Sequence, residues 1–199
     1  MSLEFLNWKS EAHMESWLQE ELSVRPRSFG ILPDLPEGYI WDHQEDGKDG
    51  AQVYVDVLRQ VYIPNADTSG RGSAPCDLLL TQQILSANTR TYVATVSVII
   101  ELKARKLKSG DFGQLVRYVD ALLRRADGAI GTGHAPEIVL GALVGDGWDR
   151  QVGQLADRIS GFRAFDTTEY GTHIVLDRLG QGLWFPHGNT LAFPAMGVE

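Results

Sequence analysis

The sequence has little of the chemistry that marks several large classes of protein. It contains one cysteine, Cys76, among 199 residues, which excludes an internal disulfide framework and a zinc site built from several cysteines. Its five histidines show no paired spacing of the kind that metal ligands adopt. Because no histidine is placed by the sequence to activate it, Cys76 is predicted to be a small packed residue rather than a nucleophile.

Long apolar runs are also missing. The longest candidate, Val93 to Ile100, is too short to span a membrane and is followed by Glu101 and Lys103. The first residues, MSLEFLNWKSE, lack the basic, apolar and small-residue order of a signal peptide. The sequence therefore predicts a cytoplasmic protein without a membrane segment. With 43% apolar and 22% charged residues, it predicts one domain over residues 1–199, with a core at about 10–178 and a tail at 180–199.

Net positive charge, the usual mark of a nucleic-acid-binding domain, is absent as well, since the formal net charge is −8. The charge is unevenly distributed, however. Residues 103–125 hold seven basic and two acidic side chains, a local balance of +5 that leaves −13 for the rest. Such asymmetry fits one basic face on an acidic body. From charge alone, a solvated helix face is the simpler interpretation.

Apolar periodicity predicts alternating helices and strands. The expected elements are a helix at 10–22 with Ser10 as its N-cap, a strand at 53–63, a loop at 65–74, a hairpin of strands 77–84 and 92–103 with its turn at 86–89, a helix at 112–125, a strand at 137–144, a helix at 149–159 and two closing strands within 163–179. This order predicts an α/β sandwich around a central mixed sheet flanked by helices.

Charged residues follow the most apolar of these strands. Side chains alternate across a strand, so Glu101 and Lys103 share one face while Leu102 points to the other. Asp77 begins the neighbouring apolar strand, and a hairpin would bring it beside Glu101. Two carboxylates and the main-chain carbonyl of Leu102 are hard oxygen ligands suited to Mg²⁺ or Mn²⁺. Lys103 would orient and help deprotonate a water molecule and offset phosphate charge.

Pro75-Cys76-Asp77 and Glu101-Leu102-Lys103 resemble the motifs of the PD-(D/E)XK nuclease superfamily. Gln114 and Tyr118 share one face of the helix that follows, and they resemble the Q-x-x-x-Y signature of its RecB-like branch. The acidic first helix is similar to that of the same branch, with Glu11 a better match than Glu15. The C-terminal half is similar to mismatch- and branch-cutting endonucleases, and the resemblance covers most of residues 10–178.

The resemblance implies a restriction-endonuclease-like core and a metal-dependent endonuclease that hydrolyses DNA phosphodiester bonds in repair, recombination or defence. It implies that Asp77, Glu101 and the Leu102 carbonyl hold Mg²⁺ or Mn²⁺, that Lys103 serves the water, and that Glu11 contributes a further carboxylate. Gln114 and Tyr118 would position the site or the phosphate. The residues expected to contact nucleic acid are Arg105, Lys106, Lys108 and Arg125.

Some features depart from the family pattern or admit other interpretations. The 24 positions from Asp77 to Glu101 exceed a compact hairpin, residues 53–74 resemble an insertion, and Asp56 within it is a rival metal ligand. Taken singly, Asp77 also fits a turn cap, and Glu101 with Lys103 fits a surface ion pair. The alternative functions are a catalytically silent subunit that binds nucleic acid or a partner protein, and a nuclease active only within a complex. RNA as the substrate, a protein partner and a homodimer are all compatible with the sequence.

Overall fold

The computed structural model describes the chain in several segments. The backbone is described for residues 10–24, 32, 35, 37–42, 56–129, 137–145, 150–151, 162–167 and 171–177. Side chains are described for residues 10–24, 32, 35, 37–42, 56–122, 138–145 and 150–151. The predicted tail at 180–199, and the predicted helix at 149–159 apart from residues 150–151, lie outside the described residues.

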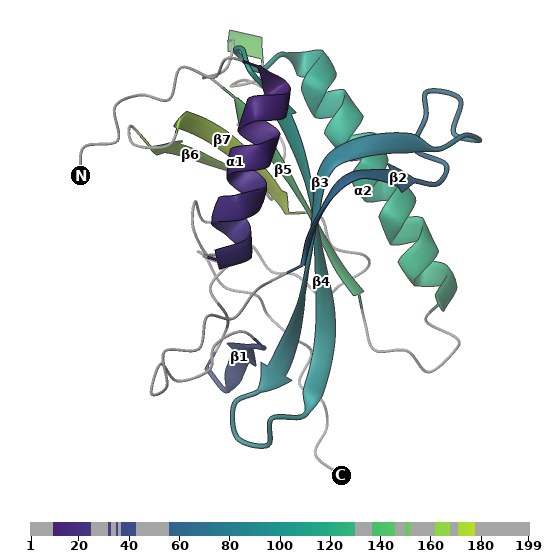
Figure 1. The fold of residues 1–199 in the computed structure, drawn as a ribbon. Coiled ribbons are helices and arrows are strands. Elements are labelled where there is room, and N and C mark those ends of the chain that lie inside the picture. The colour runs from purple at the N-terminus through teal and green to yellow at the C-terminus, as the bar shows by residue number, and fades with distance from the viewer. Residues whose placement is uncertain are drawn as a thin grey trace.

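Seven strands of the described chain form one curled mixed sheet with helices on its two faces (Figure 1). The elements are α1 Glu11–Val24, β1 Tyr39–Trp41, β2 Val57–Ile63, β3 Ala74–Ser86, β4 Tyr92–Lys103, α2 Ser109–Ala129, β5 Glu137–Gly145, β6 Phe162–Thr167 and β7 Gly171–Asp177. The strand order is β1-β3-β4-β5-β7-β6, and β2 pairs with the first half of β3. Only β4 and β5 are parallel neighbours in this sheet, and α2 is the crossover that joins them. The predicted α/β architecture with a mixed sheet flanked by helices is confirmed.

The predicted elements are found with shifted ends. β4 has the predicted bounds, β3 begins three residues earlier than predicted, and β6 and β7 are the two closing strands. β2 is described from Val57, and the predicted residues 53–55 of that strand lie outside the described part. α2 extends beyond the predicted helix at both ends, and a side-chain cap in its first turn accounts for the earlier start.

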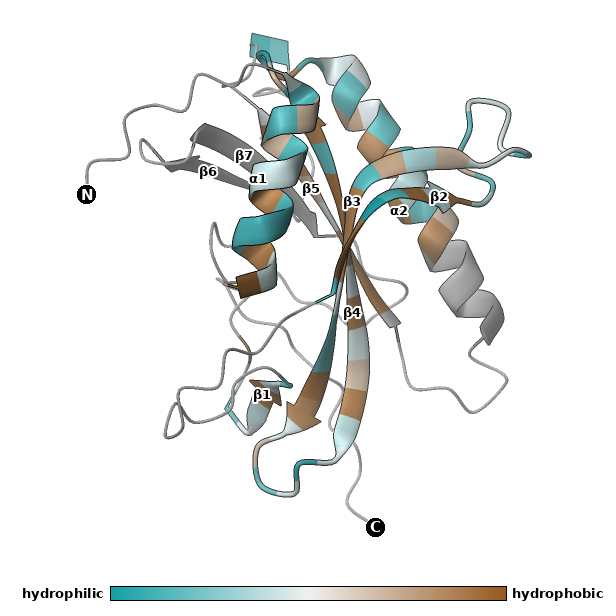
Figure 2. Ribbon diagram, viewed as in Figure 1, coloured by the Kyte–Doolittle hydropathy of each residue, from teal (hydrophilic) through white to brown (hydrophobic). Residues whose placement is uncertain are grey.

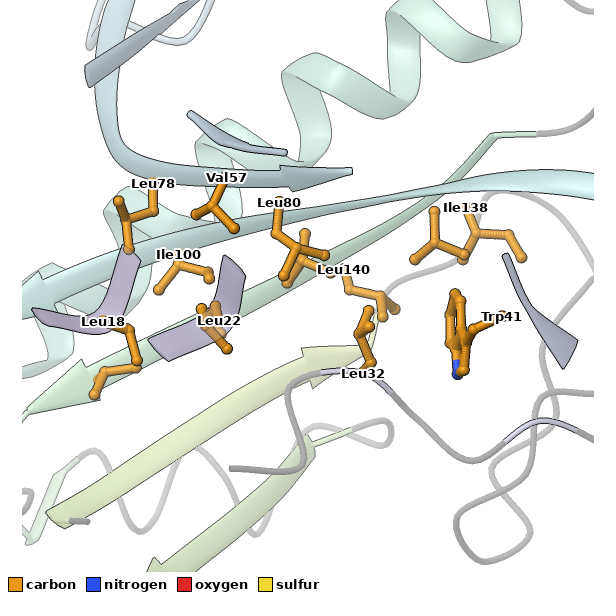
Figure 3. Packing of buried hydrophobic residues seen from close by; sticks show 14 of the residues in the cluster. Leu18, Leu22, Leu32, Trp41, Val57, Leu78, Leu80, Ile100, Ile138 and Leu140 are labelled. Carbon is orange, nitrogen blue, oxygen red and sulfur yellow. The ribbon is translucent and has the colours of Figure 1, made fainter. Parts of the chain in front are cut away.

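Apolar side chains of α1 pack on one face of the sheet. Met14, Leu18 and Leu22 recur every four residues and are almost fully buried, which places them on one stripe of the helix. They join β-strand residues such as Leu78 and Ile100 in one core cluster (Figure 3). Because β4 alternates, Val98, Ile100 and Leu102 belong to this cluster, whereas Ile99 belongs to the cluster on the α2 side.

The opposite face of the sheet is covered by α2. Leu115 and Val119 of the helix pack with Ile99 and Leu143 in a second core cluster. The helix lies very close to β5 at Gly141. A Cβ atom added to this glycine would stand only 2.8 Å from Val119 Cγ2. Figure 2 shows apolar residues along β4 and β5, between the two helices. The final residues of β4 are thus held between two packed layers.

The β2–β3 pair changes faces halfway along. In β3, Cys76 belongs to the α2-side cluster, whereas Leu78 belongs to the α1-side cluster two residues later. In β2, Val57 and Ile63 are divided between the clusters in the same way. The change falls at Gln60, whose φ of 50° lies in the left-handed region. The two strands therefore twist sharply here and curve over α2 (Figure 1).

Each helix begins at a side-chain cap. Ser10 Oγ accepts the His13 N–H at 3.2 Å, which confirms the predicted N-cap of α1. In α2, Asp111 Oδ2 accepts the main-chain N–H of Lys108, the residue before the helix, at 2.8 Å. Asp111 is the third residue of the helix, and an acidic side chain there that accepts the N–H of the residue before the helix forms one half of a capping box. It starts α2 three residues earlier than the apolar pattern predicts.

Candidate active site

The candidate site lies where β3 and β4 separate. The antiparallel pairing of the two strands ends at Leu78 and Ile100. Just beyond that pair, the Leu102 N–H donates to Asp77 Oδ2 at 2.7 Å. A side-chain carboxylate thus takes the place of a main-chain carbonyl of β3. Hydrogen bonds to charged acceptors are short and strong, so this one fixes Asp77 against the end of β4.

Glu101 is the most deeply buried carboxylate in the described part of the chain, with 1% of its surface exposed. Its Oε2 atom accepts a hydrogen bond from Gln114 Nε2 at 3.1 Å. Its Oε1 atom is buried and has no hydrogen-bond partner among the described residues. A buried acceptor in this state costs free energy unless a proton or a cation satisfies it.

Lys103 places its ammonium among three oxygen atoms. Lys103 Nζ donates to the Leu102 carbonyl at 2.9 Å and lies 3.4 Å from Glu101 Oε2 and 3.9 Å from Asp77 Oδ2. These are the three groups that the sequence analysis assigns to a metal. Only 13% of the lysine side chain is exposed. The site is thus built to surround positive charge with oxygen.

Helix α2 supplies the amide and hydroxyl that brace this cluster. Besides Glu101, the Gln114 amide donates to Tyr118 Oη at 3.0 Å, so both of its N–H groups are used. Tyr118 in turn donates to the Pro75 carbonyl at 2.7 Å. The chain of hydrogen bonds links β4 to β3 two residues before Asp77. The i, i+4 pair noted in the sequence therefore positions the site from the helix.

Burial and neighbouring charges shape the protonation of Asp77, Glu101 and Cys76. Burial, and then the Asp77 charge, raises the pKa of Glu101 to about 7, although Lys103 opposes the shift. Burial also raises the pKa of Asp77, against the Leu102 N–H and the Lys103 charge. The pKa of Cys76 rises to about 12, chiefly through burial and the nearby carboxylates. Cys76 is therefore a neutral, packed thiol.

On the other side of Asp77, β2 connects the site to α1. Gln60 Nε2 lies 3.4 Å from Asp77 Oδ1 and 3.3 Å from Glu15 Oε2. Glu15 is 6% exposed and accepts a hydrogen bond from Arg59 Nε at 2.7 Å. Glu11 is exposed, and its charge contributes to the raised pKa of Asp77 after burial, the largest cause. Of Glu11 and Glu15, Glu15 is therefore the one bonded into the site.

Sequence reasoning missed the Arg59, Gln60 and Glu15 contacts. Residues 53–74 look like an insertion. Position 60 has a left-handed backbone, which glycine or asparagine would have indicated, but the residue there is glutamine. The available signal was in the helix: Glu15 is one residue after Met14 and three before Leu18, which places it beside the apolar stripe.

The basic segment after β4 divides into two kinds of residue. Both terminal nitrogens of Arg105 bond to Asp111, at 2.7 and 2.8 Å, so this arginine supports the start of α2. Lys106 and Lys108 are exposed. The Arg125 side chain lies outside the described side chains. The structure thus ties Arg105 to Asp111, whereas Lys106 and Lys108 present exposed charge.

The rival ligand Asp56 does not join the cluster. Its carbonyl accepts the Thr81 N–H at 3.4 Å, four residues along β3 from Asp77, and its side chain is exposed. Over the described residues, no group of three or more histidine, cysteine and acidic side chains is arranged to hold a metal. The oxygen donors that converge are two carboxylates and one main-chain carbonyl.

Comparisons of the chain with protein-family models, with curated proteins and with solved structures found no match. Within the described segments, no helix is both long enough and apolar enough to cross a membrane.

Proposed function

We propose that the chain is a metal-dependent nuclease of the PD-(D/E)XK type, with a restriction-endonuclease-like core, that hydrolyses DNA phosphodiester bonds. One observation carries the proposal. Asp77 Oδ2, Glu101 Oε2 and the Leu102 carbonyl converge within 3.9 Å of a single ammonium, that of Lys103. Carboxylates and a carbonyl are the ligands that hard divalent cations select, and a lysine beside them suits phosphate chemistry.

The residues present fit Mg²⁺ or Mn²⁺. Glu101 has a buried oxygen with no hydrogen-bond partner in the described chain, so it has a lone pair to offer. Asp77, Glu101 and the Leu102 carbonyl would hold the cation. When bound, such a cation lowers the pKa of water and offsets charge on the scissile phosphate. The cation would also reduce the repulsion between Asp77 and Glu101. The Asp77 charge is the second cause, after burial, of the raised Glu101 pKa.

The remaining residues of the chain have separate tasks. Lys103 would orient the attacking water and stabilise charge on the phosphate, because its ammonium already lies at the centre of the cluster. Gln114 keeps Glu101 Oε2 in place through a 3.1 Å hydrogen bond, and Tyr118 anchors that amide to β3. The Leu102 N–H does the same for Asp77. These positioning residues preserve the geometry of the two carboxylates.

The test uses purified protein with Mn²⁺ and single-stranded, duplex, mismatched and branched DNA, with RNA as a further substrate. Cleavage that needs Mn²⁺ and disappears in Asp77→Asn supports the proposal. Mn²⁺ should also raise the melting temperature of wild type and not of Asp77→Asn, because a ligand that binds only the folded state stabilises it. If Mn²⁺ neither stabilises the protein nor supports cleavage, the proposal fails and a silent nucleic-acid- or protein-binding subunit is the better interpretation.

A further inference from the structure

Gln60 stands between the two acidic groups on the α1 side of the site. Its Nε2 atom is 3.4 Å from Asp77 Oδ1 and 3.3 Å from Glu15 Oε2. Both acceptors are carboxylates, so only the NH₂ end of the amide can face them, and each takes one N–H. Glu15 is itself fixed, because it is buried in α1 and bonded to Arg59 at 2.7 Å.

This arrangement repeats the one on the opposite side of the sheet. There, Gln114 divides its two N–H groups between Glu101 Oε2 and the anchored hydroxyl of Tyr118. Here, Gln60 divides its N–H groups between Asp77 and the anchored carboxylate of Glu15. Each carboxylate of the site is thus held by a glutamine whose second N–H is tied to a fixed group.

The backbone conformation of Gln60 also suggests a role for its side chain. Gln60 has a φ of 50° in the middle of β2, a conformation that side chains with a Cβ atom rarely adopt. Glycine would fit such a φ without strain, yet glutamine occupies the position. A strained residue that also aims its amide at a buried acidic cluster suggests a role for the side chain itself.

We infer that Gln60 is a positioning residue that orients Asp77 for cation binding, acting from Glu15 as its fixed anchor. The inference rests on the proposed function, since it assigns Asp77 to a metal. Leu102 N–H holds one oxygen of Asp77 and Gln60 holds the other, so the carboxylate plane is set from both sides. Partners of this kind, which bond to a metal ligand rather than to the metal, tune metal affinity strongly.

Two substitutions separate the amide from the backbone. Gln60→Gly removes the amide and accepts the left-handed φ, whereas Gln60→Ala removes the amide and keeps the strain of a Cβ atom. The Gly variant should therefore melt at a higher temperature than the Ala variant. Both variants should need about tenfold more Mn²⁺ to reach half of the full rise in melting temperature. Leu58→Ala, at an exposed position on the same strand, should bind Mn²⁺ as wild type does.

Cleavage provides a second readout that a merely structural role would not change. The Mn²⁺ concentration for half-maximal cleavage should rise about tenfold in both variants, while the rate at saturating Mn²⁺ stays close to that of wild type. Wild-type Mn²⁺ dependence in both variants would overturn the inference. A higher Mn²⁺ requirement in Gln60→Ala alone, with Gln60→Gly like wild type, would also overturn it, because the effect would then come from backbone conformation. Either result leaves the proposed nuclease intact. A wild-type protein that neither binds Mn²⁺ nor cleaves removes the proposed function, and the inference with it.

Discussion

At the scale of single residues, Asp77, Glu101 and Lys103 form one charged cluster at the end of β4. Burial raises the pKa of both Asp77 and Glu101, and the Asp77 charge raises the pKa of Glu101 further. The Lys103 ammonium opposes both shifts from a nearly central position. One positive charge faces two negative ones, which leaves the cluster able to accept a further cation.

Lys103→Ala should leave metal binding intact and remove catalysis. The ammonium competes with a cation for the same three oxygens, so its removal should not weaken the rise in melting temperature with Mn²⁺. Cleavage should fall by about 10²–10⁴-fold, the range for loss of a positioned proton-transfer group. Single-turnover cleavage and thermal shift measure the two effects, with Arg90→Asn, in the turn at the opposite end of β4, as the control that also removes one positive charge. Wild-type cleavage by Lys103→Ala would reduce the lysine to an ion-pair partner.

The pH dependence of metal-free stability should report on Glu101. Its pKa is about 7 in the folded protein against an ordinary 4.5, so the folded state binds the extra proton between these values. Stability should therefore fall as pH rises from about 4.5 to about 7 and then level off, by at most about 3 kcal/mol. Glu101→Gln should flatten this part of the curve. Denaturant unfolding in EDTA at several pH values measures it, and parallel curves for the two proteins would contradict the assignment.

At the scale of elements, the start of α2 determines where Gln114 stands relative to Glu101. Asp111 accepts the Lys108 N–H and both terminal nitrogens of Arg105, and its carboxylate is nearly buried. Burial works to raise the pKa of Asp111, but these hydrogen bonds outweigh it and leave the pKa below its ordinary value. The ionised carboxylate therefore fixes the first turn of the helix one turn before Gln114.

Removal of this cap should be felt as a loss of stability. Asp111→Ala should cost about 0.5–2 kcal/mol, the usual range for loss of a helix N-terminal cap, with a smaller ion-pair contribution. Arg105→Ala should cost less, at most about 1 kcal/mol, because 44% of its side chain is exposed. The double variant should be no worse than Asp111→Ala alone, as expected for residues that act through one contact. Chemical denaturation of the four proteins tests this, and strictly additive losses would show that the two residues act separately.

The helix and strand patterns predicted these elements because their signals are local. Alternation in β4 indicated that Glu101 and Lys103 share a face, and the i, i+4 spacing placed Gln114 with Tyr118. The contact between Gln60 and Asp77 had no local signal, since it depends on a face change shared by two strands. The pairing of Arg105 with Asp111 was not predicted either. A count of charges does not show which residues pair, and these two are brought together by the loop before α2 and the start of that helix.

At the scale of the whole molecule, the acidic chain has one local excess of positive charge. Residues 103–125 carry +5 and the remainder −13. The structure reduces the charge available to a ligand there, because Lys103 is turned into the site and Arg105 is bound to Asp111. Any electrostatic attraction of nucleic acid by the described part of this segment must then rest mainly on exposed residues such as Lys106 and Lys108.

The salt dependence of binding tests this surface. If Lys106 and Lys108 contact phosphates, each lost contact should lower the magnitude of the log-affinity against log-salt slope by about 0.9 on duplex DNA, or about 0.7 on a single strand. Lys106→Gln with Lys108→Gln should weaken binding to all sequences alike and scarcely change the melting temperature. Fluorescence anisotropy in Ca²⁺ buffer keeps cleavage from masking binding. Arg90→Asn, in the turn at the opposite end of β4, removes one charge as the control and suits the positive φ there. An unchanged slope in the double variant would assign these lysines to solvent and require nucleic acid to enter by another face.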